Sequence, residues 1–530
     1  MPDTSTSAAE LPLSATISVF QRTIITLTVM AATMMEVLDT SIVNVALPNM
    51  QGELGCTLDE ISWVSTGYII SNVIILPLTG WLSDFFGRKR YLFYSVILFT
   101  LASLGCGVSG SLGLLVVCRV LQGLGGAAFL STAQATLMEI YPKHQQGFAQ
   151  AIFGMGVVMA PTLGPTLGGY LVDNFSWPWI FNVNIPVGIL AAILIWTSVP
   201  DSTTAGERRS PDVLGIFLLA VGLGCLQTIL EKGERDDWFE AGYIRVLAGF
   251  AVAGIISFLW WELSPRNKNP AINLRVLRNR NLAAGSISAI ALGFALYGAT
   301  LVLPQYWQTV QSHTAQQTGM LLFPGGLATA AVMPLLGKLL QIVDARALIA
   351  TGMLIHASAM FVLMNVMTLS TNDMTFFLPL ILRGVGIGFQ FVPLSVSSLG
   401  TLKPREVGQG AGLYNLFRQL GGSFGIAFLA TMLSRRQKFH YARLTEHLSD
   451  VGTDTLARVD TLQQMFISKG ADATTAHNQA VAVLTGTLRG QAANMTYMDI
   501  FMFLGVLSIF SILTVFLFAK ATNKSAASVH

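Results

Sequence analysis

Five ionisable side chains lie inside long apolar stretches of the sequence, where a charge is costly. The carboxyl groups belong to Glu36 and Asp39, and the guanidinium groups to Arg119, Arg383 and Arg418. Such groups are rare in membrane-spanning segments and usually functional. Glu36 and Asp39 are three residues apart and therefore share one face of a helix. Because apolar surroundings and a neighbouring carboxylate both favour the neutral form of a carboxyl group, this pair is suited to bind and release a proton.

Arg119 is the expected counter-charge for Asp39, since a buried charge needs a partner. In the first interpretation, Asp39 takes part in proton coupling and Arg119 responds to its charge. In the alternative, the pair only joins two helices. For Glu36 both interpretations stay open, and its role is inferred from physical reasoning alone.

The elements that must position these residues are membrane-spanning helices, so we predict an all-α membrane protein. Hydrophobic residue types make up 52% of the 530 residues and charged types 11%, whereas an average soluble domain has about 25% charged residues. So few charges cannot cover a soluble enzyme, and the same composition excludes a disordered chain. Fourteen segments have the length of about 20 mostly apolar residues that a spanning helix needs; they are residues 24–46, 61–82, 91–110, 112–136, 147–172, 178–199, 211–230, 243–262, 282–310, 317–340, 346–368, 374–398, 407–433 and 497–519.

Charge and cysteine content exclude several functional classes. The formal net charge is +3, which is too small to indicate nucleic-acid binding. The four cysteines have no CxxC spacing, so the sequence indicates neither a metal site nor a disulfide framework. Residues 1–21 lack a basic start, and we expect no cleaved signal.

The distribution of Lys and Arg predicts the orientation of the chain. Short loops on the side of the N-terminus hold most of these residues, and loops of this kind are usually cytoplasmic. Both termini are therefore expected in the cytoplasm. Arg435, Arg436 and Lys438 conflict with the rule, because they follow the thirteenth segment on the opposite side.

The loop GWLSDFFGRKR, between the second and third segments, combines an acidic group with a basic cluster. We interpret it as a gate latch, in which the acidic group caps a helix end or pairs with an arginine. The alternative is that the cluster only sets the orientation. The latch residues are Gly80, Asp84, Gly87, Arg88 and Arg90.

Residues 151–169 read AIFGMGVVMAPTLGPTLGG and are rich in small residues and proline. Such a helix permits close approach of a neighbouring backbone and also bending. Tight packing and a hinge are both compatible with this pattern. The hinge candidates are Pro161, Gly164, Pro165, Gly168 and Gly169.

Seven segments, in this order along nearly the whole chain, resemble motifs of the major facilitator superfamily. They are LDTSIVNVALP (38–48), GWLSDFFGRKR (80–90), RVLQGLGGAA (119–128), APTLGPTLGG (160–169), WPWIFNVNIPVG (177–188), LPQYWQTV (303–310) and YNLFRQLGGSFG (414–425). Within the superfamily, the chain is similar to the fourteen-span drug:proton antiporters of the EmrB/QacA type. One departure is Ala160, which stands where the family's antiporter motif usually has Gly.

The resemblance implies the major facilitator fold, with two six-helix halves and a central substrate cavity. The halves would be residues 24–199 and 282–519, with Arg383 in the second half as the pseudo-symmetric counterpart of Arg119. The remaining parts are cytoplasmic tails, two linker spans and a basic cytoplasmic loop, at residues 1–23, 520–530, 200–265 and 266–281.

The activity that the resemblance implies is proton-coupled export of lipophilic, cationic or amphipathic drugs across the bacterial inner membrane. The proton gradient would supply the energy, with no cofactor. The long periplasmic loop 434–496 favours the EmrB branch, whose partners are a periplasmic adaptor and an outer-membrane channel; a passive connection is the alternative. The cavity candidates are Tyr68, Met155, Met159, Tyr297, Tyr306, Phe389, Gln390, Tyr414 and Asn415, with Arg383 and Arg418 as second-half charges.

Other functions stay open as alternatives. The exported compound would then be an endogenous metabolite, a fatty acid or a siderophore. An intramembrane enzyme is a remote alternative, because GGSFG at 421–425 fits the G-x-S-x-G pattern but lies in an expected helix rather than a strand–turn–helix. The third alternative is a membrane receptor without transport activity.

Overall fold

Long helices form most of the described part of the protein, which in this computed structural model comprises residues 17–200, 211–450 and 452–519. Fourteen of them, within this part, are long and apolar enough to cross a membrane, and no strand occurs there. The predicted number of spans and the all-α class are therefore confirmed. The tail residues 1–16 and 520–530, and residues 201–210 of the predicted linker, lie outside the described residues.

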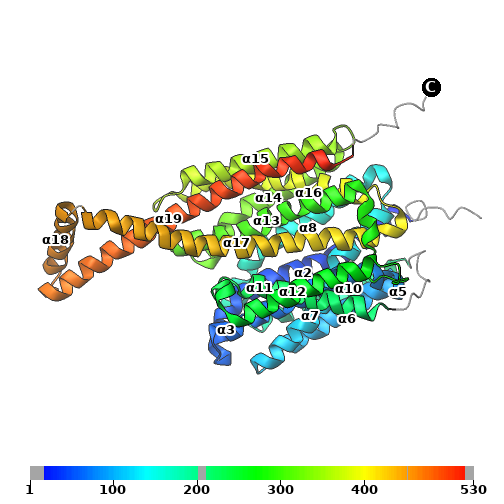
Figure 1. Cartoon of the computed structure of the whole chain (residues 1–530), viewed down its shortest axis with the longest axis horizontal. Helices are drawn as coiled ribbons and strands as arrows, with labels where there is room; N and C mark the ends of the chain where they lie inside the picture. Colours follow the sequence, from blue (N-terminus) through cyan, green and yellow to red (C-terminus); the bar gives the residue numbers. More distant parts are fainter. Residues whose placement is uncertain (1–16, 201–210, 451, 520–530) are drawn as a thin grey trace, which may run out of the picture.

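The chain is organised as two bundles with a pair of helices between them in sequence (Figure 1). The first bundle consists of α2 (Val19–Leu54), α3 (Leu58–Ile61), α4 (Trp63–Ile75), α5 (Thr79–Phe86), α6 (Arg88–Gly107), α7 (Leu112–Ile140), α8 (Gln146–Asn174), α9 (Trp179–Asn182) and α10 (Asn184–Ser198). The second consists of α13 (Arg280–Thr309), α14 (Ala315–Leu339), α15 (Ala345–Val366), α16 (Phe377–Leu399), α17 (Val407–Asp450), α18 (Gly452–Ser468) and α19 (Ala473–Ser511). Short 3-10 helices occur at η1 (Leu76–Leu78), η2 (Lys143–Gln145), η3 (Trp238–Glu240), η4 (Leu274–Arg278), η5 (Asp373–Phe376), η6 (Pro404–Glu406) and η7 (Ile512–Leu517).

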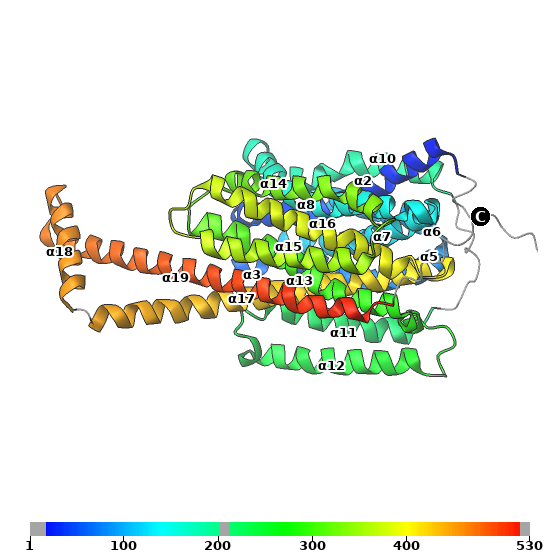
Figure 2. The same cartoon turned by 90° about the horizontal axis from the view of Figure 1, so that it is seen from above.

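The two linker helices lie on the outside of the bundles. α11 (Val213–Lys232) packs on α4 of the first bundle and on α17 of the second, and α12 (Gly242–Leu263) packs mainly on α11. Figure 2 shows α12 as the outermost helix of this layer. The linker pair therefore covers the outside of the two bundles.

The two bundles share one hydrophobic core. α8 packs against α2 on one side and against α14 on the other, and α17 packs against α5 and α7. Met30 and Phe153 of the first bundle belong to the same buried cluster as Met333 and Phe391 of the second. α8 continues as one helix although it contains prolines, which within lipid-spanning helices are tolerated where neighbouring groups satisfy the freed carbonyls.

The last two spans extend far beyond the predicted segments. α17 continues to Asp450 and α19 already begins at Ala473, so the segment 434–496 is a helical hairpin with α18 at its tip, projecting from the bundles (Figure 1). Hydropathy located only the lipid-sized parts at 407–433 and 497–519, because the helices continue with polar residues. The start of α2 and the end of the described chain lie at the opposite end of the molecule from α18 (Figure 2).

The basic residues that conflicted with the predicted orientation lie on the extension of α17. There Arg436 Nη2 is 2.5 Å from Asp499 Oδ2 of α19, and His440 Nε2 is 2.7 Å from the same oxygen. The charge of Arg436 is therefore compensated by a carboxylate that is distant in the sequence. Such a paired cation in a long helical segment gives little information about orientation.

Candidate functional site

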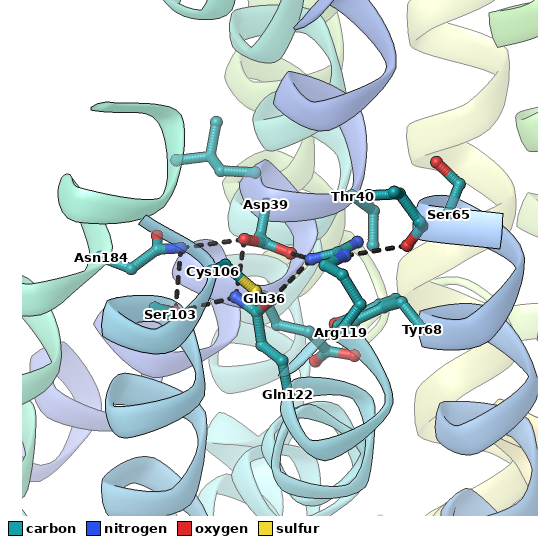
Figure 3. A network of polar contacts seen from close by, with 12 residues as sticks. Glu36, Asp39, Thr40, Ser65, Tyr68, Ser103, Cys106, Arg119, Gln122 and Asn184 are labelled. Atoms are coloured by element: carbon teal, nitrogen blue, oxygen red, sulfur yellow. Dashed lines mark hydrogen bonds and ion pairs between the residues drawn. The ribbon is translucent and has the colours of Figure 1, made fainter. Parts of the chain in front are cut away.

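Asp39 of α2 lies buried at the centre of a polar network in the first bundle (Figure 3). Arg119 Nη1 of α7 donates to Asp39 Oδ2 at 2.5 Å. Gln122 Nε2 of α7 and Asn184 Nδ2 of α10 each donate to Asp39 Oδ1 at 2.9 Å. Gln122 Nε2 also donates to Ser103 Oγ of α6 at 2.8 Å. The Asp39 carboxylate thus connects α2 to two other helices of its bundle, and Gln122 extends the network to α6.

The guanidinium of Arg119 has further partners besides Asp39. Nη1 donates to Gln122 Oε1 at 2.6 Å, and Nε donates to the carbonyl oxygen of Val64 in α4 at 3.0 Å. Its Cζ lies 4.2 Å from the ring centroid of Tyr68, a distance that allows a cation–π contact. A buried ion pair is stable only where additional hydrogen bonds offset desolvation. These contacts meet that condition, so the network can hold a charge inside the bundle.

Glu36 lies one helical turn before Asp39 but has different partners. Its Oε1 accepts a hydrogen bond from Asn72 Nδ2 of α4 at 3.0 Å, whereas its buried Oε2 has no hydrogen-bond partner in the described chain. Tyr68 is close to Glu36, Asp39 and Arg119, and its hydroxyl is likewise buried without a partner. The carboxyl group of Glu36 therefore keeps one unbonded oxygen, whereas both oxygens of Asp39 are hydrogen-bonded.

Two further arginines are buried in the second bundle. Arg383 lies on α16 and Arg418 on α17, and the ion pairs found among the described residues include neither of them. The pseudo-symmetric counterpart of Arg119 thus lacks the carboxylate that Arg119 has. The second bundle does not repeat the Asp–Arg network of the first.

Several predicted cavity residues lie where the two bundles meet. Asn415 of α17 donates to Gln134 Oε1 of α7 at 2.8 Å and so links the bundles. Met155, Tyr297 and Phe389 are partly buried and pack against the core cluster that both bundles share. These residues therefore take part in the contact between the two bundles.

The other cavity candidates lie in more varied surroundings. Tyr414 is buried in a cluster that includes residues of α7, and Met159 is partly buried on α8. Tyr306 donates to the carbonyl oxygen of Thr368 at 2.9 Å within an aromatic core inside the second bundle. Gln390 donates to backbone carbonyls of α15 and α16. The structure therefore does not bring Tyr306 and Gln390 to the first bundle.

The predicted latch loop has a tight turn and an ion pair at its end. Gly87 ends α5 with a φ of +83°, a conformation that favours glycine. Arg88 then binds Glu139 of α7 through both guanidinium ends, with Nη2 2.8 Å from Oε1. Arg90 is exposed. The principal partner of the basic cluster is thus a glutamate that the sequence did not single out.

The same loop also contacts the second bundle. Gln409 Nε2 of α17 donates to Asp84 Oδ2 at 3.3 Å. A Cβ at Gly80 would lie 2.7 Å from Gln409 Cα, so only glycine fits there. The loop therefore holds α5 against the start of α17.

The glycines of α8 differ in what they contact. A Cβ at Gly164 would lie 1.8 Å from Ser41 Oγ of α2, and one at Gly168 would lie 3.2 Å from the carbonyl oxygen of Ile42. Gly169 has no atom within 4 Å of that position. Gly164 and Gly168 thus allow α2 and α8 to pack closely, whereas Gly169 has no such role.

Sequence reasoning did not identify four residues that complete these contacts. Gln122, Asn184 and Ser103 surround Asp39, and Glu139 pairs with Arg88. Gln122 and Asn184 stand inside RVLQGLGGAA and WPWIFNVNIPVG, so the motifs contained the signal. Uncharged polar residues in a membrane-spanning helix cost less than charges, so their presence in a span does not by itself mark a functional site.

The pattern GGSFG at 421–425 lies inside the helix α17, and not on the strand–turn–helix that a hydrolase nucleophile requires. Among the described residues, no cluster of three or more His, Cys, Asp or Glu could hold a metal ion.

Comparison with known proteins gives consistent matches over most of the chain. The sequence profile of the Major Facilitator Superfamily matches residues 29–426. The multidrug export protein EmrB of Escherichia coli K12 is 34% identical over 450 residues, which cover 85% of this chain and 87% of that protein. The fatty acid resistance protein FarB of Neisseria gonorrhoeae is 33% identical over 508 residues, covering 96% and 97%. The structure of the proton:xylose symporter XylE is similar in fold, with a TM-score of 0.60 and 13% identity over 94% of this chain and 95% of XylE.

Proposed function

The chain belongs to the major facilitator superfamily, and from this membership we propose that it exports amphipathic toxic compounds across the bacterial inner membrane in exchange for protons. The relatives named as multidrug export proteins support the export of drugs. The observation that carries the proton coupling is the buried Asp39–Arg119 pair, because it is a titratable group linked to several helices of one bundle.

The proposed cycle uses Asp39 as a switch. From the outside, Asp39 takes up a proton and loses its charge, which weakens its bonds to Arg119, Gln122 and Asn184. α2 is then held less tightly to α7 and α10, and the equilibrium shifts towards the inward-facing state. Release of the proton to the cytoplasm restores the pair. A compound that binds the deprotonated state is exported in exchange.

The proposed substrate contacts depend on which buried charged groups have no hydrogen-bond partner within the described chain. Asp39 is fully hydrogen-bonded, so Glu36, with its free Oε2, is the better acceptor for a lipophilic cation. The relative named for fatty acid resistance, together with the unpaired Arg418, favours amphipathic anions as a second class. Endogenous metabolites and siderophores are further candidates. In each case the protein moves its substrate, and neither catalysis nor receptor signalling is part of the proposal.

Orientation and energy source complete the proposal. The end of the molecule that holds both described chain ends faces the cytoplasm, and the hairpin of α17, α18 and α19 faces the periplasm. The proton gradient supplies the energy without a cofactor. The functional units are the halves 24–199 and 282–519 and the linker 200–265.

The hairpin supports a tripartite assembly. Its helices continue well past the lipid-sized parts of α17 and α19 and place α18 away from the bundles (Figure 1). A periplasmic adaptor that leads to an outer-membrane channel is the proposed partner.

The test is proton movement in inverted membrane vesicles. The vesicles are energised, the lumenal pH is followed with a fluorescent dye, and lipophilic cations are added to the wild type and to Asp39→Asn. We expect each exported compound to raise the lumenal pH in the wild type but not in Asp39→Asn. The matched control is Asp173→Asn, which removes an exposed carboxylate at the end of α8 and should behave like the wild type.

Immunoblotting must show equal amounts of the three proteins in the vesicles. Equal signals in all three would assign Asp39 a structural role only. The absence of a signal in all three, with compound nevertheless accumulating in the vesicles, would contradict proton antiport.

A further inference from the structure

Arg418 has the most unusual environment of the buried charges in the described chain. It lies on α17 with 1% of its surface exposed, and its Nε, Nη1 and Nη2 are all buried without a hydrogen-bond partner. A buried charge without a partner costs several kcal/mol, and nearly all buried polar groups are hydrogen-bonded. Arg119, which is equally buried, has its nitrogens on Asp39, Gln122 and Val64. This contrast indicates that the Arg418 guanidinium binds a group that is not part of the chain.

The position of Arg418 is at the junction of the bundles. Its Cζ lies 5.5 Å from the ring centroid of Phe391 on α16, and that ring is 6.2 Å from the ring of Phe153 on α8. Arg418 is also close enough to Glu36 of α2 for their charges to interact, although the two do not form an ion pair. Glu36 Oε2 is itself without a partner. A buried guanidinium on α17 and a buried carboxyl oxygen on α2 are thus both without a hydrogen-bond partner among the described residues.

The side chains around this junction are apolar and deformable. A Cβ at Gly154 of α8 would lie 2.8 Å from Phe391 and 2.9 Å from Met333 Sδ of α14. A Cβ at Gly156 of α8 would likewise come too close to the side chain of Met30 of α2. Methionine side chains adapt readily to apolar groups of different shape. The surface beside Arg418 is therefore suited to an alkyl chain or a flat ring system rather than to a polar solute.

We propose that Arg418 is a substrate-binding residue, whose guanidinium binds the carboxylate of an amphipathic organic anion while the apolar part lies against Phe391 and the neighbouring methionines. A guanidinium presents paired donors that match a carboxylate, and the three free nitrogens provide them. The proposal rests on the proposed export function and specifies one substrate class for it. Export of an anion from a negatively charged cell interior is also favoured by the membrane potential.

The test is direct binding to the purified full-length protein, without a proton gradient, so that it is independent of coupling. The probes share one alkyl chain and differ only in the head group: dodecanoate, methyl dodecanoate and dodecyltrimethylammonium. Binding is measured by calorimetry at alkaline pH, and partition into detergent is equal for all variants. We expect the wild type to prefer dodecanoate to its ester, and Arg418→Gln to weaken dodecanoate binding by about tenfold or more, since charge-assisted hydrogen bonds are the strong ones. Binding of the quaternary ammonium should be unchanged or tighter in that variant.

Two further variants make the result decisive. Arg383→Gln removes the other unpaired buried arginine and should leave dodecanoate binding unchanged. Glu36→Gln keeps the shape of the side chain, leaves Arg418 in place and removes the opposing charge, so dodecanoate should bind about threefold tighter or more. This variant tests the proposal even if Arg418→Gln does not fold. The proposal is overturned if the wild type does not distinguish dodecanoate from its ester, if Arg383→Gln weakens binding as much as Arg418→Gln, or if Glu36→Gln leaves dodecanoate binding unchanged or weaker.

Discussion

At the scale of single residues, the Asp39 network depends on an uncharged side chain. Gln122 donates to Asp39 Oδ1 and accepts from Arg119 Nη1. Gln122→Leu would leave both charged groups with a buried unmade hydrogen bond, and such a loss costs about 1–3 kcal/mol. We therefore expect a lower thermal unfolding midpoint in detergent and weaker export of drugs in cells.

The control for this prediction lies on the same helix. Ser131 is buried, but its Oγ has no hydrogen-bond partner, so Ser131→Ala removes no bond and should unfold close to the wild-type temperature. Equal destabilisation by both variants would show that the bonds of Gln122 do not matter for stability.

At the scale of elements, the packing of α2 on α8 is closest at Gly164, where a side chain would meet Ser41. A Cβ at Gly164 would overlap Ser41 Oγ, whereas the space around Gly169 is open. Gly164→Ala should lower stability by about 1–3 kcal/mol, because overpacking forces the helices apart. Gly169→Ala should be neutral or stabilising by up to about 1 kcal/mol, because alanine favours the helix. Thermal unfolding of the two variants side by side measures the difference, and a loss at Gly169 as large as at Gly164 would refute the packing argument.

The second prediction at the scale of elements concerns the contacts of Asp499, which join α19 to α17 in the hairpin. Arg436 and His440 both bind Asp499, but the side chain of Arg436 is 39% exposed. Exposed ion pairs contribute roughly 0–1 kcal/mol, so Asp499→Asn should leave the unfolding midpoint nearly unchanged. Its effect should instead be local, as faster hydrogen exchange in residues 434–446. Exchange that increases equally in the bundles would show that Asp499 stabilises the whole fold.

At the scale of the whole molecule, the sequence predicted the number of spans and the Asp39–Arg119 contact, since a carboxylate buried in an apolar helix needs a counter-charge and Arg119 lies in another span of the same half. It could not predict that Arg418 lies beside Phe391 at the junction of the bundles without a hydrogen-bond partner, because that depends on how the two bundles meet. The lengths of α17 and α19 were missed for a related reason: hydropathy measures what lies in lipid, and both helices continue into polar sequence. Tyr306 shows the same limit, since the composition of its segment does not distinguish a cavity from the core of one bundle.

The last prediction concerns the contact between the bundles at Gly80. A side chain there would meet the backbone of Gln409, so Gly80→Leu should destabilise the state in which α5 touches α17. Where the two states are close in energy, a cost of about 1.4 kcal/mol changes their ratio tenfold. Spin labels at positions 144 and 342 report on this end of the molecule, because His144 and Gln341 are in contact across the bundles. We expect longer label distances in Gly80→Leu.

The control for the Gly80 prediction is Gly113→Leu, since Gly113 has no atom within 4 Å of a Cβ. Its distance distribution should match the wild type. If Gly80→Leu shows the same distribution of label distances as the wild type, the added side chain is accommodated beside Gln409 without moving the bundles. The loop would then not act as a latch. A shift towards longer distances together with reduced export would assign to this glycine the closure of that end of the transporter, because the substitution adds bulk at that one contact and leaves Asp84, Arg88 and Glu139 in place.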